Sequence, residues 1–519
     1  MTLFTKPDLA NSTGRNGWEH RAIVALAALL FAYVVARGAL ISLTYDEIGT
    51  IFFCRTFEWA NVSESAGVHL LNAVLVSWIQ DMGGTSAAAL RSPNMVAFLL
   101  YLLASIDLGR HVARPVRLPQ FILLTTVPFL TDFFSLSRGY GMGCSGALVG
   151  IACALRYVSG GKFAWAVGAV CACMVGLAGN YTVMNCVLAV LAMLFARIWM
   201  GPGTLRDKAS RSLLAGLPLG VGALVLLPIM LDLREGGQLY FGGRNGLWQD
   251  IVGSLGRCIG YHMSYSSVVR YILKSVFALA LAWSVFGLVG AVRDKALGTR
   301  GFIAGLLPIA LLAAWAQYAL MGTPLPVERT ALIYCPLVAL AMGQCMNDPP
   351  WAIARVPGVA LASLCAAHFI ASANFTHVYS WRYESGSRTA VDLLWDTREG
   401  DIRFGITYEH SPSIWYYREQ HHFARLIVNE LSGCWDHCLG LEELDPQYYG
   451  TTCRLSSFDE GSMRAFLKPE SVDVYYLDDF YLAEMDRLDI TYDVIRRFAN
   501  SRTSLIEHVR IPKPAEAPS

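Results

Sequence analysis

The sequence predicts a mainly α-helical protein that crosses a membrane many times and ends in a small soluble α/β domain. The chain of 519 residues is 54% hydrophobic and only 16% charged, whereas soluble globular proteins carry about 25% charged residues. Long apolar segments follow one another up to about residue 375, and charged residues become frequent only after them. Lipid is therefore the main solvent of this chain.

A membrane-spanning helix needs roughly 20 predominantly apolar residues. About eleven segments meet this requirement: 21–43, 93–109, 118–136, 140–158, 163–180, 181–199, 212–231, 268–291, 301–320, 328–346 and 352–373. The fifth and sixth leave only a very tight turn at AGNYT, residues 178–182. No small-residue cleavage site follows the first segment, so we interpret it as a retained helix rather than a signal peptide.

Basic residues predict the orientation, because cytoplasmic loops are enriched in lysine and arginine. They cluster before the first predicted span and after each even-numbered one, as in 109–117, 197–211 and 293–300. All lie on one side if the N-terminus, residues 1–20, is cytoplasmic. The first loop, 44–92, and the C-terminal chain then lie outside. We expect a multi-pass protein of a bacterial inner membrane, with a transmembrane domain at 21–375 and a periplasmic domain at 376–510.

The C-terminal domain is predicted from short runs rich in β-branched and aromatic residues. Runs at 401–409 and 471–481 are typical of strands, and the second half of 411–431 and the segment 485–500 are interpreted as helices. Residues 511–519 are expected to be a disordered tail. Outside the cytoplasm a disulfide is permitted, but the sequence does not say which two of Cys434, Cys438 and Cys453 would pair.

Two adjacent carboxylates, Asp46 and Glu47, end the first apolar segment within LTYDEIGTIFF. A charged side chain in hydrocarbon is costly, so the pair must be solvated, neutralised or used. Asp132, Arg138 and Arg329 fall on the same predicted face. Carboxylates suit proton abstraction, and the guanidinium fork matches phosphate oxygens. A base and a phosphate clamp on the outer face favour group transfer from a lipid phosphate.

Five sequence segments occur in order on this predicted face: YDEIGT, GVHLLNAVLVSWI, ALRSPNMVAFLL, SLSRGYGM and PVERTALIYCPLVAL. Together they resemble the membrane-embedded GT-C glycosyltransferases, in particular bacterial relatives of protein mannosyltransferases and of the lipid A aminoarabinose transferase. The resemblance covers about residues 20–375. It implies a cell-envelope enzyme that moves a sugar from a polyprenyl-phosphate donor to a lipid, protein or polysaccharide acceptor, usually with inversion.

The resemblance also implies roles for individual residues. Asp46 would be the base, Glu47 would orient it or bind acceptor, and Asp132 is a second acidic candidate. The donor phosphate would be held by Arg138, Arg329 and Arg91. The residues expected to contact donor or acceptor are His69, Asn72, Tyr140 and Glu328.

The chain departs from the family at GVHLL, where relatives often carry PP or KPPL, so His69 stands in place of a basic or proline residue. The donor contacts of this loop are therefore open. Asp46, Glu47 and His69 are groups that can ligate a divalent metal, but neither a metal nor another cofactor is expected.

Several alternatives remain at this stage. Asp46 and Glu47 could mark a solvated helix end, Asp132 could cap a helix, and Arg138 or Arg329 could extend to lipid headgroups. A transporter is an alternative function, although its mid-span charges and broken helices are not evident. Another lipid-linked sugar enzyme, an O-antigen ligase or polymerase, is a further alternative. The balance of 41 basic and 40 acidic residues argues against nucleic-acid binding.

Overall fold

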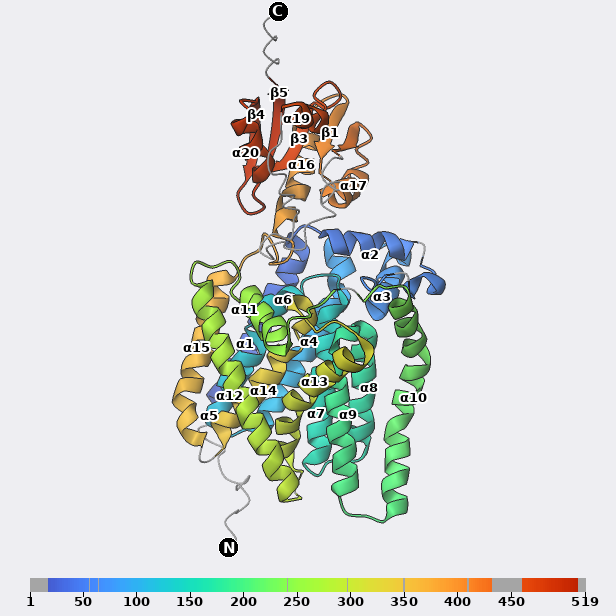
Figure 1. Cartoon of the computed structure of the whole chain (residues 1–519), viewed down its shortest axis with the longest axis vertical. Helices are drawn as coiled ribbons and strands as arrows, with labels where there is room; N and C mark the ends of the chain where they lie inside the picture. Colours follow the sequence, from blue (N-terminus) through green and yellow to red (C-terminus); the bar gives the residue numbers. More distant parts are fainter. Residues whose placement is uncertain are drawn as a thin grey trace, which may run out of the picture. The chain divides into compact units, whose positions relative to one another are not determined.

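The computed structural model describes residues 17–511 apart from 56, 64, 240, 296, 349–350, 408–409 and 432–459. The chain divides into two compact units. The helical unit comprises Met1–Ala36, Glu58–Leu75 and Arg91–Ala373, and the mixed unit comprises Arg37–Phe57, Val76–Leu90 and Asn374–Ser519. Figure 1 shows the elements of both units, and each unit is considered by itself.

The helical unit consists of α-helices joined by turns, loops and short 3-10 segments. Its helices, three of which continue into the mixed unit, are α1 (Gly17–Leu40), α3 (Leu70–Asp81), α4 (Ala87–Leu108), α5 (Arg114–Thr125), α6 (Pro128–Asp132), α7 (Gly139–Val158), α8 (Ala164–Gly179), α9 (Met184–Met200), α10 (Leu205–Glu235), α11 (Ser254–Ile259), α12 (Ser266–Arg293), α13 (Thr299–Met321), α14 (Tyr334–Asn347) and α15 (Arg355–Ser372). Within the described residues, nine helical segments are long and apolar enough to cross a membrane. The predicted polytopic α-helical architecture is confirmed.

Two of the eleven expected spans differ from the prediction. Segment 118–136 is interrupted, since α5 ends at Thr125 and the five-residue α6 begins at Pro128. The residue before a proline is driven to extended backbone, and Val127 has φ −94° and ψ 110°. Segment 163–180 is helical, but α8 has 16 residues and falls short of a full span.

The α7–α8 pair packs through glycine. A Cβ atom built on Gly146 would lie 2.4 Å from the Cα atom of Gly176, and one on Gly139 would lie 1.9 Å from the carbonyl oxygen of Gly179. Small residues allow such close helix contact in membranes, where dispersion and not the hydrophobic effect holds helices together. The predicted tight turn after α8 is present, and the Asn180 side chain accepts the N–H of Thr182 at 2.8 Å.

The mixed unit contains a five-stranded sheet in the order β2-β1-β3-β5-β4. Its strands are β1 (Ile402–Ile406), β2 (Leu426–Glu430), β3 (Val474–Asp478), β4 (Thr491–Phe498) and β5 (Thr503–Arg510), with helices α2 (Tyr45–Arg55), α16 (Ser387–Thr397), α17 (Ser411–Gln420), α19 (Glu460–Leu467) and α20 (Asp479–Arg487). The pairs β1–β2 and β1–β3 are parallel, and β3–β5 and β4–β5 are antiparallel. The predicted α/β character is confirmed.

Two local predictions in this unit are wrong. The second half of 411–431 contains strand β2 (Leu426–Glu430) instead of a helix, and half of 485–500 forms strand β4 (Thr491–Phe498). Both segments contain β-branched residues, and sheet pairing supplies backbone hydrogen bonds that a local pattern does not reveal. Cys434, Cys438 and Cys453 lie outside the described residues, as does the end of the predicted tail.

Candidate functional site

The acidic pair opens helix α2, and its two members have different surroundings. The Thr44 N–H donates to the Glu47 carboxylate at 2.9 Å, and the Glu47 N–H donates to Thr44 Oγ1 at 3.4 Å. This reciprocal arrangement is a capping box, which satisfies otherwise unpaired donors at a helix start. Glu47 is fully buried, whereas Asp46 is half-buried. Glu47 therefore stabilises the first turn, and Asp46 is the more accessible carboxylate.

A third carboxyl group, Glu384, contacts the same helix start. Its side chain is buried, accepts the backbone N–H of Tyr45, and accepts the Ser413 hydroxyl at 2.7 Å. Burial raises the pKa of Glu384 well above its usual 4.5, and the negative charges of Asp46 and Glu47 raise it further. Glu384 is thus favoured as a neutral acid beside the pair.

Sequence reasoning did not single out Glu384, because it lies more than 330 residues from Asp46. The available signal was its place in WRYESG, directly after the last apolar segment.

Contacts within the mixed unit fix α2 at both ends. The Leu43 N–H donates to the Tyr417 hydroxyl at 2.7 Å. At the other end, the Arg55 guanidinium binds both carboxylate oxygens of Glu419 at 3.0 and 2.9 Å. Helix α17 therefore contributes to holding the acidic pair, a role that no sequence motif indicates.

In the helical unit, positive charge gathers around His69. Burial lowers the pKa of this imidazole well below its usual 6.5, and the positive charges of Arg138 and Arg329 lower it further. His69 is therefore neutral at physiological pH. Its Nδ1 atom lies 3.4 Å from the Asn180 amide, and its Nε2 atom is buried with no hydrogen-bond partner among the described residues.

Asparagine side chains fix the backbone that presents Arg138. The Asn72 amide donates to the carbonyl of Ser137 at 3.1 Å, and the Asn94 amide donates to the Asn72 side-chain oxygen at 2.9 Å. Both asparagines are fully buried. Gly139 then allows close approach, because a Cβ atom there would lie 2.6 Å from the His69 Cβ. Asn72 therefore helps to fix the backbone of Arg138, the residue that follows Ser137.

The second arginine is presented by an ordered loop. The Arg329 guanidinium stacks over the Phe241 ring at 4.5 Å from its centroid, a cation–π contact. Gly243 and Leu325 exchange backbone hydrogen bonds of 2.9 Å. The Asp250 carboxylate accepts the N–H groups of Asn245 and Gly246 at 2.8 and 3.0 Å. The glycine-rich segment FGGRNG is therefore anchored and not a free connector.

Glu328 precedes this arginine in a left-handed conformation with φ 48°. Its N–H donates to the Ser254 hydroxyl at 2.7 Å, and its carboxylate lies within electrostatic reach of Arg257 and Arg329. A non-glycine residue at positive φ is uncommon and is held there by its surroundings. Arg257 was not anticipated from the sequence, because α11 is too short to show a pattern.

The other predicted residues of this unit are buried. Asp132 accepts the Tyr261 hydroxyl, which lies 2.9 Å from both carboxylate oxygens. Tyr140 packs its ring edge-on against His69 at 4.8 Å between centroids, and Arg91 is fully buried. Asp132 thus has a structural partner, which favours a positioning role over proton abstraction.

The structure brings the predicted residues together in two sets. Asp46 and Glu47 belong to the mixed unit, where Glu384 joins them. His69, Arg138 and Arg329 gather in the helical unit, which also contains Arg91, Asn72, Asp132, Tyr140 and Glu328. Among the described residues, no three His, Cys, Asp or Glu side chains are grouped as metal ligands would be.

No protein-family profile and no curated protein sequence matches the chain. Among solved structures, ArnT from Cupriavidus metallidurans bound to undecaprenyl phosphate is similar at 13% identity and a TM-score of 0.51, over 95% of this chain and 98% of that one. The apo form of that ArnT gives 13% identity and 0.48, over 94% and 97%. EmbB arabinosyltransferase from Mycobacterium smegmatis gives 13% identity and 0.32, over 72% of this chain and 43% of that one.

At 13% identity, the structural similarity to undecaprenyl-phosphate-bound ArnT establishes the fold and nothing beyond it. The chain has the fold of this ArnT, and its long apolar helices indicate a multi-pass membrane protein. The resemblance drawn from the sequence motifs is confirmed at the level of fold.

Proposed function

We propose that the protein is a membrane glycosyltransferase that moves a sugar from a polyprenyl-phosphate donor to an acceptor on the extracytoplasmic face of a bacterial inner membrane. The proposed orientation places the N-terminus in the cytoplasm and the C-terminal residues in the periplasm, as the distribution of arginine and lysine favours. The undecaprenyl phosphate bound to the structurally similar ArnT makes a polyprenyl phosphate the natural donor class to test.

The observation that carries the proposal is the cationic cluster of buried Arg138 and partly buried Arg329 beside a neutral histidine. Guanidinium groups keep their charge when buried, and they match phosphate oxygens in geometry. Held cations stabilise the charge that develops on a departing phosphate. The buried Nε2 atom of His69 offers a further hydrogen bond to a ligand in this cluster.

In the proposed reaction, the bond between the anomeric carbon of the sugar and the phosphate oxygen breaks. The nucleophilic atom of the acceptor forms a new bond to that carbon, and its proton passes to the Asp46 carboxylate. The polyprenyl phosphate leaves as an anion, so it needs little acid assistance. Glu47 and Glu384 hold the helix start that carries Asp46.

The test uses purified full-length protein in detergent with radiolabelled polyprenyl-phosphate sugars. Asp46→Asn removes the proposed base and is expected to reduce sugar transfer by about 10²- to 10⁴-fold, the usual contribution of a general base. Donor binding should persist, because the arginines are unchanged. Asp81→Asn is the matched control, since Asp81 is exposed in the same unit.

Undiminished transfer by a folded Asp46→Asn variant would contradict the role of Asp46 and direct attention to Asp132. If the protein bound the polyprenyl-phosphate sugar without transferring the sugar, and moved the intact lipid across a vesicle membrane, the result would favour a transporter. Failure of the wild-type protein to bind any lipid-phosphate sugar would contradict the donor class.

A further inference from the structure

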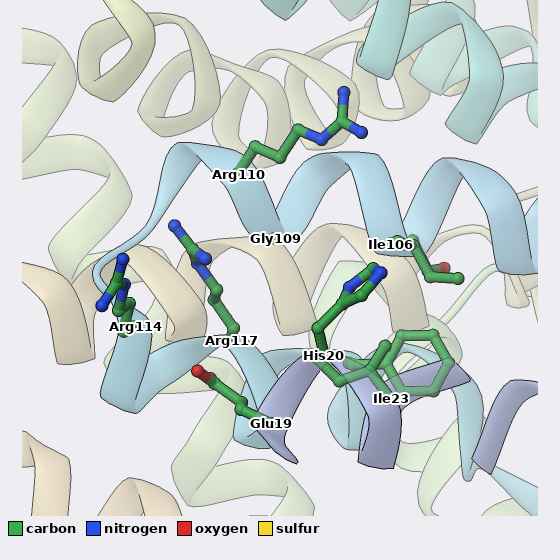
Figure 2. Close-up of a pocket in the computed structure, with 10 residues that line it drawn as sticks. Glu19, His20, Ile23, Ile106, Gly109, Arg110, Arg114 and Arg117 are labelled. Atoms are coloured by element: carbon green, nitrogen blue, oxygen red, sulfur yellow. The ribbon is translucent and has the colours of Figure 1, made fainter. Parts of the chain in front are cut away.

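The mixed unit contains a cavity of about 520 Å³, which is larger than the cavity of about 210 Å³ that Figure 2 shows in the helical unit. Every residue that lines the larger cavity belongs to the mixed unit. Its walls come from the end of α1, the loop after α15, the start of α16, the end of β4 and the turn that follows β4. The proposed function uses none of the lining residues.

Positive charge exceeds negative charge in the lining of this cavity. Its charged residues are Arg388, Asp392, Arg496 and Arg497, an excess of two positive charges. The negative charge of Asp392 is shared, because one carboxylate oxygen lies 3.6 Å from Arg388 Nε and the other lies 2.7 Å from His421 Nε2. An anion that enters the cavity therefore meets a favourable potential.

A bulge in strand β4 precedes two consecutive arginines that both line the cavity. β4 is an edge strand of the sheet, and its pairing with β5 shifts by one residue between Val494 and Arg496. Bulges re-aim the side chains of the strand that carries them. Arg496 and Arg497 are both exposed, and the Arg496 guanidinium lies 5.8 Å from the centroid of the Phe498 ring. Their charge is therefore accessible to a ligand from solvent.

A glycine lets the start of α16 approach the sheet beside the cavity. A Cβ atom on Gly386 would lie 2.5 Å from the Tyr476 hydroxyl oxygen and 2.9 Å from the Phe498 Cγ atom. Either contact would push α16 away from the sheet. Glycine at this position therefore permits α16 and β4 to form the walls of one cavity.

The uncharged part of the lining suits a sugar. Hydroxyl and amide side chains line the cavity, namely those of Ser42, Thr376, Ser385, Thr389 and Asn500. The rings of Phe375 and Phe498 line it too, and an aromatic ring offers an apolar face to the C–H groups of a pyranose. The Asp392 carboxylate can accept hydroxyl groups, whereas it would repel a simple anion. An acyl chain would require a continuous apolar wall, which this mixture of side chains does not provide.

The cavity adjoins the helix start that carries Asp46. The Ser42 hydroxyl donates to the carbonyl of Ser385 at 3.5 Å, and the Tyr45 N–H donates to the Glu384 carboxylate. These two segments therefore run side by side. Ser42 and Ser385 line the cavity, and Asp46 follows directly after Tyr45.

We propose that this cavity binds a negatively charged sugar residue of the acceptor, one that carries a carboxylate or a phosphate group. Arg496, Arg497 and Arg388 bind the anionic group, while Asp392 and the hydroxyl side chains bind sugar hydroxyls. Guanidinium groups suit both anions, because they form charge-assisted hydrogen bonds with either. The assignment of this sugar to the acceptor rests on the proposed function, in which Asp46 takes the proton of the acceptor.

The test measures the thermal midpoint of purified, full-length protein in detergent, without donor, during titration with glucuronate, glucose 6-phosphate, glucose or inorganic phosphate. A ligand that binds the folded state raises this midpoint. At least one of the two acidic sugars should stabilise the wild-type protein at a concentration about tenfold below that of glucose or inorganic phosphate, and the tighter one identifies the anionic group. In Arg496→Gln/Arg497→Gln, its half-saturating concentration should rise by about tenfold or more, since hydrogen bonds to charged groups are strong.

The matched control is Arg502→Gln/Arg510→Gln, which removes the same charge from two exposed positions on the β4–β5 hairpin that do not line the cavity. This variant should titrate like the wild type. An equal loss of affinity in the control, or no stabilisation by either acidic sugar, would overturn the proposal. Equal stabilisation by inorganic phosphate would identify a free-anion site instead. Stabilisation by phosphatidylglycerol micelles but by no sugar would identify a lipid-headgroup site, and either result would also overturn the proposal.

The acceptor role is tested separately, in the transfer assay with radiolabelled donor. The acidic sugar that binds should inhibit transfer by the wild-type protein, and about tenfold more of it should be needed for the double variant. Sugar binding without any transfer would keep the site and contradict the proposed function. Transfer that the bound sugar does not inhibit would keep the proposed function and overturn the acceptor assignment.

Discussion

The helical unit and the mixed unit both gather ionisable groups at their candidate sites, but the first gathers arginines and the second gathers carboxyl groups. The helical unit gathers Arg138 and Arg329 around a neutral His69. The mixed unit gathers Glu384 with Asp46 and Glu47. A buried arginine keeps its charge because its pKa lies far above physiological pH, whereas burial favours the protonated form of a carboxyl group. We therefore expect the first cluster to be insensitive to pH and the second to be tunable by it.

Among the three variants that test this comparison, removing a guanidinium from the helical unit is expected to give the largest effect. Arg138→Gln should reduce sugar transfer by about 10²- to 10³-fold, the usual result of deleting one electrostatic stabiliser of developing charge. Because arginine stays charged, the ratio of variant to wild-type rates should be constant from pH 6 to pH 8. Steady-state transfer assays measure this, with the exposed Arg206→Gln as control. Full activity of Arg138→Gln would contradict the proposal that this cluster binds the donor phosphate.

The next variant tests the structural role of Asp132, a buried carboxyl group in the helical unit, and its expected effect is smaller than that of Arg138→Gln. Tyr261→Phe removes a hydroxyl that lies 2.9 Å from both Asp132 oxygens. A buried hydrogen bond contributes about 0.5–1.5 kcal/mol, so the thermal midpoint in detergent should fall. Transfer by the folded fraction should stay within a few-fold of wild type. A large loss of transfer with an unchanged midpoint would instead assign Asp132 and Tyr261 to catalysis.

The smallest expected effect comes from Glu384 and concerns how the stability of the protein depends on pH. The pKa of Glu384 is raised in the folded protein, so the folded state binds its proton more tightly than the unfolded state does. The free energy of unfolding must then fall as pH rises from about 4.5 through the folded-state pKa. Glu384→Gln should flatten this decline, because an amide is always neutral and can still accept the Tyr45 N–H.

Thermal midpoints measured from pH 4.5 to pH 8 test this prediction. Glu399→Gln is the control, since Glu399 is exposed in the same unit. A wild-type decline that persists unchanged in Glu384→Gln would show that Glu384 does not carry it.

Local sequence patterns predicted the membrane helices well because hydropathy and length are properties of a continuous segment. They failed at a local proline break and where a neighbouring element decided the outcome. Val127 precedes Pro128 and divides one expected span, and the pairing of β2 with β1 converts an expected helix into a strand. The tight turn at Asn180 was predictable, since its side chain satisfies a local N–H.

The sequence by itself determined that this chain is a polytopic, mainly helical membrane protein with a C-terminal α/β region, and it indicated which carboxylates and arginines lie at span ends. Only the tertiary structure decided their chemical states. Glu384 meets the start of α2 across more than 330 residues, and Arg138 and Arg329 approach His69 from separate segments of the helical unit. A pKa depends on burial and on charges nearby in space, and neither can be read from the order of residues along a chain.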